Sequence, residues 1–372
     1  MEKSKVSLIR CSRYDTQDVE KAVGLAVDIL GGPEAFARKG DRVLIKPNLL
    51  TDALPEEGVD THPEVVRAVI RLFKPLASRI YCGDGPNVWG EKKDVERVYE
   101  VSGMKKVCRE EGIEMVAFTV PKMRSGYPLT EWLEKTDRLI NVPKFKTHSY
   151  TILTAGVKNL FGLVVGMNKM KIHKDFPSPA GLSRALLDIY ESRKPDLTIL
   201  DGIMAMEGEG PGSCGTVRPM ELVAAAQDAL ALDFVLAVIM GLVPEDIPTI
   251  REAGRRGLFP ETFSDIDIKG EDIRFFVAKD YRLPRTSFLN RMPDWAAVIA
   301  RKMLRMKVCV IQDLCRACQK CRQSCPAEAC RMEGGRMIID ESKCIFCLCC
   351  QEICPHKAIE VKKNFFLRMM TR

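Results

Sequence analysis

The sequence predicts an α/β fold, in which a mostly parallel sheet carries helices on both faces, followed by a small α+β domain. Short apolar runs that end in Gly, Pro, Asn or Asp alternate with segments whose apolar residues recur at helical spacing. Such alternation is typical of a parallel sheet covered on both faces. The 372 residues, 46% hydrophobic and 29% charged, are enough for two or three domains. Cysteine is concentrated at one end, because 11 of the 15 cysteines follow residue 300.

The predicted strands are short apolar runs closed by turn residues. Arg42 to Lys46 stops at Pro47-Asn48, and Arg79 to Cys82 stops at a Gly-Asp-Gly-Pro turn. In chain order, the predicted strands are residues 5–10, 42–46, 79–82, 113–118, 138–142, 197–200, 221–226 and 273–278.

The predicted helices have apolar residues at helical spacing and recognisable ends. Thr61 to Glu64 reads as a capping box for a helix that runs to Pro75. Ser178 and Pro179 supply an N-cap and a first-turn proline for a helix that stops at Pro195. The other predicted helices are residues 17–30, a segment reaching residue 112, 229–240, 247–256 and a basic helix at 294–307.

Two cysteine quartets with the same spacing, C-x2-C-x2-C-x3-C followed by proline, dominate the C-terminal end. They are Cys315, Cys318, Cys321 and Cys325, then Cys344, Cys347, Cys350 and Cys354. A thiolate every third residue suits a [4Fe-4S] cluster. Zinc and disulfides are the alternatives, but zinc sites pair two C-x2-C units across a longer gap.

The doubled motif resembles a bacterial two-cluster ferredoxin. The resemblance implies two [4Fe-4S] clusters whose fourth ligands cross over between the quartets. One cluster would be held by Cys315, Cys318, Cys321 and Cys354, and the other by Cys344, Cys347, Cys350 and Cys325. The quartets repeat at 29 residues, and Gly334-Gly335 suits a hairpin turn between the two halves. We expect Cys309, Cys330 and Cys349 to be bystanders.

Composition bounds the compartment and the partners. Residues 301–372 hold 15 Lys and Arg against 7 Asp and Glu, which leaves 42 against 43 in the other 300 residues. Two anionic clusters would cancel part of this local excess, and no aromatic residues alternate with the basic ones, so we expect no nucleic-acid binding. No apolar run is long enough to span a membrane, so we expect a cytoplasmic protein. Cluster chemistry calls for a reducing, anaerobic setting.

Polar segments follow four predicted strands directly. They are Lys46-Pro47-Asn48, Gly83-Asp84-Gly85, residues 143–148 and Asp201-Gly202. Because ligands bind beyond the carboxyl ends of parallel strands, we expect these four loops to meet at one rim of the sheet. The alternative is that they are solvated turns.

The chain also resembles the iron–sulfur proteins that carry domain of unknown function 362, over residues 5 to 360. The matching stretches are Leu44-Ile-Lys-Pro-Asn48, Thr61-His-Pro-Glu64, Val142-Pro-Lys-Phe-Lys-Thr-His148, Gly156-Val-Lys-Asn-Leu-Phe-Gly162, Asp201-Gly-Ile and Glu207-Gly-Glu-Gly-Pro211. This resemblance implies an architecture and motif positions, and no particular reaction. With it, we expect an α/β domain at residues 1–283, a linker and basic helix at 284–307, and a ferredoxin-like domain at 308–362.

The strand-end lysines predict a bound anion, a carboxylate or phosphate. We expect Lys46, Lys144, Lys146 and Lys158 to hold it, with Asn48, Asn159 and His148 as orienting groups. Asp84, Asp201 and Glu207 are the available internal partners, so a self-contained ion-pair network is the alternative. The glycine run 208–215 could form an anion-binding nest or a mobile loop.

Three residues are candidates for catalysis. His148 stands among lysines and threonine, Lys144 directly follows a strand and a proline, and Asp233 interrupts an apolar helix. The alternatives are a structural histidine and a solvent-facing helix-start carboxylate. His173 is a weaker candidate on the same grounds.

The sequence leaves two functions open. In the first, the chain is an oxidoreductase whose clusters deliver single electrons to an anionic substrate or cofactor at the rim. In the second, it is a carrier or assembly factor with an α/β docking domain. Both require a redox partner protein or a low-potential electron donor. No dinucleotide fingerprint is present, because Gly83-Asp84-Gly85 lacks a third glycine at the needed spacing.

Overall fold

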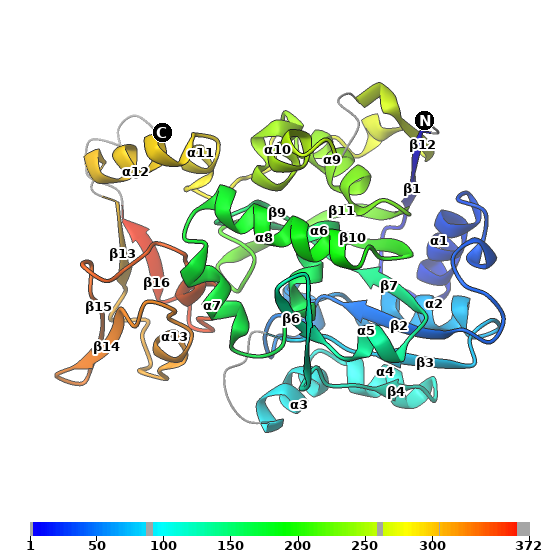
Figure 1. The fold of residues 1–372 in the computed structure, drawn as a ribbon, viewed down its shortest axis with the longest axis horizontal. Coiled ribbons are helices and arrows are strands. Elements are labelled where there is room, and N and C mark those ends of the chain that lie inside the picture. The colour runs from blue at the N-terminus through cyan, green and yellow to red at the C-terminus, as the bar shows by residue number, and fades with distance from the viewer. Residues whose placement is uncertain (1–2, 87–91, 259–262, 305, 363–372) are drawn as a thin grey trace.

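A computed structural model describes residues 3–86, 92–258, 263–304 and 306–362 (Figure 1). Its centre is a ten-stranded mixed sheet with the order β12-β1-β11-β10-β7-β2-β3-β4, while β8 and β9 extend from β10. The strands are β1 (Ser4–Arg10), β2 (Arg42–Pro47), β3 (Arg79–Cys82), β4 (Glu114–Met115), β7 (Arg138–Val142), β8 (Lys144–His148), β9 (Ile152–Thr154), β10 (Leu197–Gly208), β11 (Gly215–Ala226) and β12 (Ile266–Gly270). The run from β10 through β7, β2 and β3 to β4 is parallel, and β11 is antiparallel to both β10 and β1.

Helices cover both faces of the sheet, which confirms the predicted α/β class. Successive residues of β2 point to opposite faces, as pleating requires: Val43 and Ile45 join one apolar core and Leu44 joins the other. The helices of the first 283 residues are α1 (Thr16–Asp28), α2 (Pro63–Phe73), α3 (Lys92–Val101), α4 (Met104–Glu110), α5 (Trp132–Lys135), α6 (Gly156–Asn159), α7 (Asn168–Asp175), α8 (Pro179–Ser192), α9 (Ala229–Ile239) and α10 (Pro248–Arg255). A separate hairpin pairs β5 (Pro121–Arg124) with β6 (Tyr127–Thr130).

Three sequence predictions are wrong in this part of the chain. Residues 273–278 are not the last strand, because Ile273–Phe275 forms a 3-10 turn capped by Asp272 and the edge strand is β12, parallel to β1. Of residues 113–118, only Glu114–Met115 pairs as a strand. The segment 143–148 is not a loop, because Lys144–His148 forms strand β8 and all five residues are buried.

The capping box at Thr61 is also wrong. The N-cap of α2 is His62, whose Nδ1 accepts a hydrogen bond from the Glu64 backbone N–H at 3.2 Å. The Thr61 hydroxyl instead accepts from the Asn48 backbone N–H at 2.8 Å and donates to the Val142 carbonyl at 2.7 Å. Thr61 therefore ties together the ends of two strands, β2 and β7.

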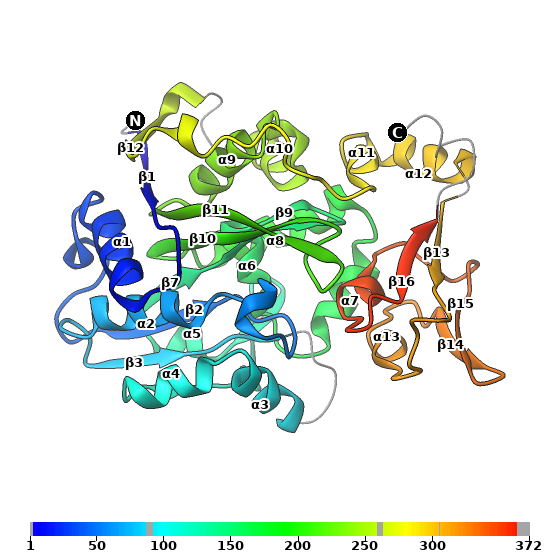
Figure 2. The same cartoon turned by 180° about the vertical axis from the view of Figure 1, so that it is seen from behind.

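The C-terminal region packs against one end of the sheet, next to α7 (Figures 1 and 2). It comprises α11 (Ser287–Asn290), α12 (Asp294–Met303), β13 (Lys307–Val310), α13 (Lys320–Gln323), β14 (Cys330–Glu333), β15 (Arg336–Ile339), α14 (Cys349–Glu352) and β16 (Ile359–Lys362). The hairpin predicted at Gly334-Gly335 is confirmed by the β14–β15 pairing. The linker is ordered against the sheet domain, because the side chains of Thr286 and Asn290 donate to the Ser149 carbonyl at 2.6 and 3.0 Å.

We predict that residues 1–283 fold alone, without iron. They contain all ten strands of the sheet and both of its apolar cores, whereas residues 289–361 form a separate, smaller core that includes cysteines of both quartets. A chain ending at residue 283 should give a cooperative thermal unfolding transition by circular dichroism. An aggregate with no transition would place the boundary elsewhere.

Candidate functional site

Two buried lysine–aspartate pairs occupy the rim where strands β2, β3, β8 and β10 come together. Lys46 Nζ lies 2.7 Å from Asp84 Oδ1, and both side chains are at most 2% exposed. Lys144 Nζ lies 2.9 Å from Asp201 Oδ2, and both side chains are fully buried. Tyr14 completes the second pair, because its hydroxyl accepts from Lys144 and donates to Asp201, each at 2.7 Å. Four of the expected rim residues therefore neutralise one another.

A third buried lysine, Lys146, has a partner that the sequence analysis missed. Its ammonium donates to the Val59 carbonyl at 2.6 Å and interacts electrostatically with Asp60. Burial is the main cause that lowers the pKa of Lys146 to about 7 and raises that of Asp60 to about 7. The signal for Asp60 was its place immediately before the Thr61 to Glu64 stretch.

Three other candidates lie in different surroundings. Asn159 belongs to the rim, because its Oδ1 accepts from Lys46 at 3.3 Å. Asp233 does not reach the lysines; its carboxylate accepts from the backbone N–H groups of Gly156 and Val157 at 2.6 and 3.0 Å and so anchors α6. Glu207 pairs with Arg282 at 2.5 Å and Arg218 at 3.1 Å, so the grouping of Glu207 with the rim lysines is wrong.

Asn48 and Lys158 each have a polar side-chain group without a hydrogen-bond partner among the described residues. The Asn48 side-chain oxygen is buried and accepts no hydrogen bond from the described residues. Lys158 has no hydrogen bond or ion pair in the described part of the chain, and its ammonium lies 5.6 Å from the centre of the Phe161 ring. Burial lowers the pKa of Lys158, while the negative charge of Glu352 acts in the opposite direction. Lys158 is therefore the lysine of the expected set that remains available to a ligand.

His148, at the end of β8, connects the rim to the cysteine-rich region. Its Nδ1 accepts from the backbone N–H groups of Tyr150 and Thr151 at 3.0 and 3.2 Å, which leaves the ring proton on Nε2. That Nε2 lies 3.1 Å from Glu352 Oε1, although the two atoms are not aligned as a hydrogen bond. Burial lowers the pKa of His148 to about 4. Burial alone would raise the pKa of Glu352, but His148, Lys158 and His173 outweigh it and lower that pKa to about 2.

The glycine-rich turn between β10 and β11 also contacts this region. A Cβ on Gly212 would overlap the Glu352 carbonyl oxygen, so only glycine permits the contact. The Ser213 hydroxyl donates to the Cys354 carbonyl at 2.6 Å. The turn thus packs on the segment between the last two cysteines of the second quartet, and neither expected role, anion nest or mobile loop, describes it.

The cysteines gather in two groups whose membership mixes the quartets. One small cavity is lined by Cys315, Cys318, Cys321 and Cys354. In the other group, burial raises the pKa of Cys344 to about 11, with further contributions from Cys350, Cys347 and Cys325. Four thiols around one cavity are the donor set that a [4Fe-4S] cluster requires. Cys330 belongs to the same small core as Cys321, Cys325 and Cys350, which its sequence position did not reveal.

Comparison with known proteins agrees with both parts of the chain. A family model described as "Domain of unknown function (DUF362)" matches residues 43–238, and one described as "4Fe-4S binding domain" matches residues 337–360. A thylakoid-associated protein of Synechocystis is 36% identical over 286 residues, which cover 75% of this chain and 87% of the relative.

Two further relatives match only a short part of this chain. The ferredoxin of Methanothermococcus thermolithotrophicus is 34% identical over 59 residues, 15% of this chain and 98% of the ferredoxin. A component of the ion-translocating oxidoreductase complex of Methanosarcina acetivorans is 46% identical over 48 residues, 13% of this chain and 18% of that component. The lactate racemase apoprotein of Thermoanaerobacterium thermosaccharolyticum superposes with a TM-score of 0.38 and 14% identity, over 61% of this chain and 56% of the racemase, which is too low to support an argument.

We predict that Lys144→Ala destabilises the protein strongly and Lys158→Ala does so far less. Removing Lys144 leaves Asp201 buried without its cation, which costs roughly 3–5 kcal/mol. Lys158 has no such partner within ion-pair distance among the described residues. Urea unfolding of both variants measures the difference, and equal losses would contradict the assignment of the two lysines.

Proposed function

The chain belongs to the domain of unknown function 362 family, and we propose that it passes single electrons from a ferredoxin-like domain to an anionic substrate or cofactor at the strand-end rim. Its 4Fe-4S binding domain gives the chain an iron–sulfur electron-transfer role. The observation that carries the rest is the contact between Glu352 and His148, because Glu352 lies between Cys350 and Cys354 while His148 ends a rim strand. The proposed cluster ligands and the rim are therefore connected by a buried contact.

The proposed cluster ligands follow the two cysteine groups. Cys315, Cys318, Cys321 and Cys354 would hold one [4Fe-4S] cluster, and Cys344, Cys347, Cys350 and Cys325 the other. When bound, such clusters supply one-electron chemistry. The first group contains one exposed cysteine, Cys318, whereas every cysteine of the second group is buried or half-buried. A redox partner protein would therefore meet the first group, and the rim would meet the second.

The anionic ligand is best supported beside Lys158. Lys46 and Lys144 are already neutralised by aspartates, whereas Lys158 and the ring nitrogens His148 Nε2 and His173 Nδ1 have no hydrogen-bond partner among the described residues. The charges of Glu352 and Lys158 influence the pKa values of both histidines. His148 would orient the ligand, and Lys158 would balance its charge.

A carrier or assembly factor is the second candidate, and one observation favours it. The Lys46–Asp84 and Lys144–Asp201 pairs are closed by internal partners, so these four residues need no ligand to be stable. In that case the α/β domain would dock a partner and the clusters would shuttle electrons or be passed on.

None of the helices that the structure describes is long and apolar enough to cross a bilayer. The cytoplasm remains our proposal for its location.

We predict about eight iron and eight sulfide per chain after anaerobic purification, because eight cysteines form the two groups. Cys325→Ser should lower the content of the cluster held by Cys344, Cys347 and Cys350. The cluster held by the other three cysteines of its own quartet should be retained. Iron analysis and electron paramagnetic resonance of the reduced protein measure both outcomes. Loss of the first-quartet signal alone would refute the crossing.

We also predict that a small carboxylate or phosphate compound raises the melting temperature of the wild type but not of Lys158→Ala. The screen should include phosphate, nucleotides and dicarboxylates, and any hit should reoxidise the dithionite-reduced protein. Lys171→Ala is the control, because Lys171 lies on the exposed side of α7. If the protein carries its full cluster content and no compound raises the melting temperature or reoxidises the reduced protein, the result favours the carrier function over the enzyme.

A further inference from the structure

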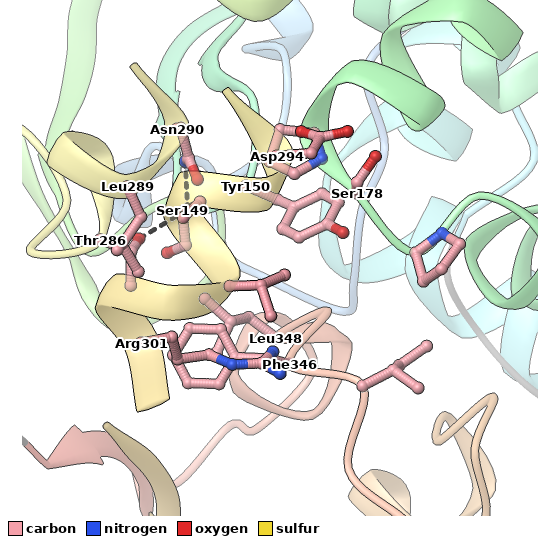
Figure 3. Close-up of a pocket in the computed structure, with 15 residues that line it drawn as sticks. Ser149, Tyr150, Ser178, Thr286, Leu289, Asn290, Asp294, Arg301, Phe346 and Leu348 are labelled. Carbon is pink, nitrogen blue, oxygen red and sulfur yellow. Dashed lines mark hydrogen bonds between the residues drawn. The ribbon is translucent and has the colours of Figure 1, made fainter. Parts of the chain in front are cut away.

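A second cavity, separate from the rim lysines, lies between the sheet domain, α11–α12 and the second cysteine loop (Figure 3). It offers about 60 Å³ to the centres of water-sized molecules, and it is open to solvent. That space corresponds to roughly four to six waters, which suits one small ring rather than a large ligand. Its walls are mainly apolar and include Pro179, Leu289, Ala297, Val298, Phe346 and Leu348. A ligand in it would therefore have a largely apolar body.

One polar group in the cavity has no partner. The Tyr150 side chain is 5% exposed, and its hydroxyl makes no hydrogen bond with any residue that the structure describes. Burial raises the pKa of Tyr150, so the phenol stays protonated and is available as a donor. The other polar wall residues Thr286 and Asn290 are already bonded to the Ser149 carbonyl. A buried donor without an acceptor is destabilising, and a ligand oxygen would supply the missing acceptor.

The charged groups of the cavity narrow the class of ligand. Arg301 stacks with its guanidinium 5.2 Å from the centre of the Phe346 ring, and Asp294 lines the same cavity. Figure 3 shows Arg301 and Phe346 together across the cavity from Tyr150. One cation and one anion give no net attraction for a phosphate or carboxylate. A neutral ligand whose oxygen accepts from Tyr150 fits better.

The cavity adjoins both the cysteines and an apolar surface. Phe346 and Leu348, which line it, flank Cys347 in the chain. At the mouth, Val298 belongs to an exposed apolar stripe of α12 with Trp295, Ile299 and Met303, which are 71%, 50% and 76% exposed. These residues recur at helical spacing on one side of α12. An apolar ligand with a hydrocarbon tail could enter along this stripe.

We propose that this cavity binds the ring of a lipid-soluble quinone, with Tyr150 donating a hydrogen bond to one carbonyl oxygen. A quinone combines a neutral apolar ring, two acceptor oxygens and the capacity to accept electrons. Its reduction to the hydroquinone takes two electrons, which the iron–sulfur domain supplies one at a time, and two protons from solvent, one on each oxygen. The inference rests on the proposed electron-transfer role but not on the rim ligand.

Binding of menadione to the oxidised, cluster-loaded protein tests the site without turnover. We expect saturable binding by calorimetry, weakened about three- to tenfold in Tyr150→Phe because one hydrogen bond is lost. Ala297→Trp fills the cavity from α12 and should weaken binding at least about tenfold by blocking the ring. Lys302→Trp is the matched control on the same helix, because Lys302 is exposed and neither lines the cavity nor belongs to the apolar stripe; its affinity should equal that of the wild type.

Cluster content, measured by absorbance and iron analysis in each sample, separates the two proposals. Protein without iron–sulfur clusters would refute the proposed function. Full cluster content with no saturable menadione binding, or with equal affinity in the wild type, Tyr150→Phe and Ala297→Trp, would overturn the quinone site alone.

Discussion

The buried carboxylate of Asp201 holds together more of this molecule than any other single group on the rim. Its Oδ2 accepts from Lys144 at 2.9 Å and from the His62 backbone N–H at 2.8 Å, and its Oδ1 accepts from Tyr14. These contacts join β8, β10, the start of α2 and the loop after β1. The Lys46–Asp84 pair plays a similar part on the other side, and it explains Gly162, where a Cβ would overlap both Asp84 Oδ1 and Lys46 Nζ. Charges buried this deeply are tolerated only when paired, so the rim has little freedom to change its residues.

The arrangement of the rim gives its lysines different functions. Lys46 and Lys144 have a structural role, because each is paired with an aspartate of the same chain. Burial instead brings the pKa values of Lys146 and Asp60 both to about 7. Lys158 is left facing His148, His173 and Glu352. The ligand site that we propose is therefore at the junction with the cysteine-rich region rather than at the centre of the lysines. A ligand beside Lys158 would be close to the region that we propose as the electron source.

The sequence was sufficient to predict features that depend on the spacing of residues close to one another in the chain. The cysteine quartets, the Gly334-Gly335 hairpin and most strands of the parallel sheet follow from short-range patterns. It was insufficient where burial contradicts composition: Lys144 to His148 looks like a solvated loop because charged residues are rarely buried, yet pairing with aspartates makes it a strand. Residues 266–270 were missed as the edge strand because Asp267 and Lys269 interrupt the apolar run. The partner Glu352 could not be found, because a contact between residues distant in sequence leaves no periodic signal.

The contact between the sheet domain and the cysteine-rich region depends on a few small or buried groups. Gly212 must lack a side chain to meet Glu352, Ser213 bonds to the Cys354 carbonyl, and Thr286 and Asn290 fix the Ser149 carbonyl on the opposite side. Ser149, Thr286 and Asn290 line the proposed quinone cavity, whereas Glu352 contacts His148 at the rim. The short segment from Phe346 to Glu352 therefore links the two proposed sites, since its first residue lines the quinone cavity and its last residue contacts His148.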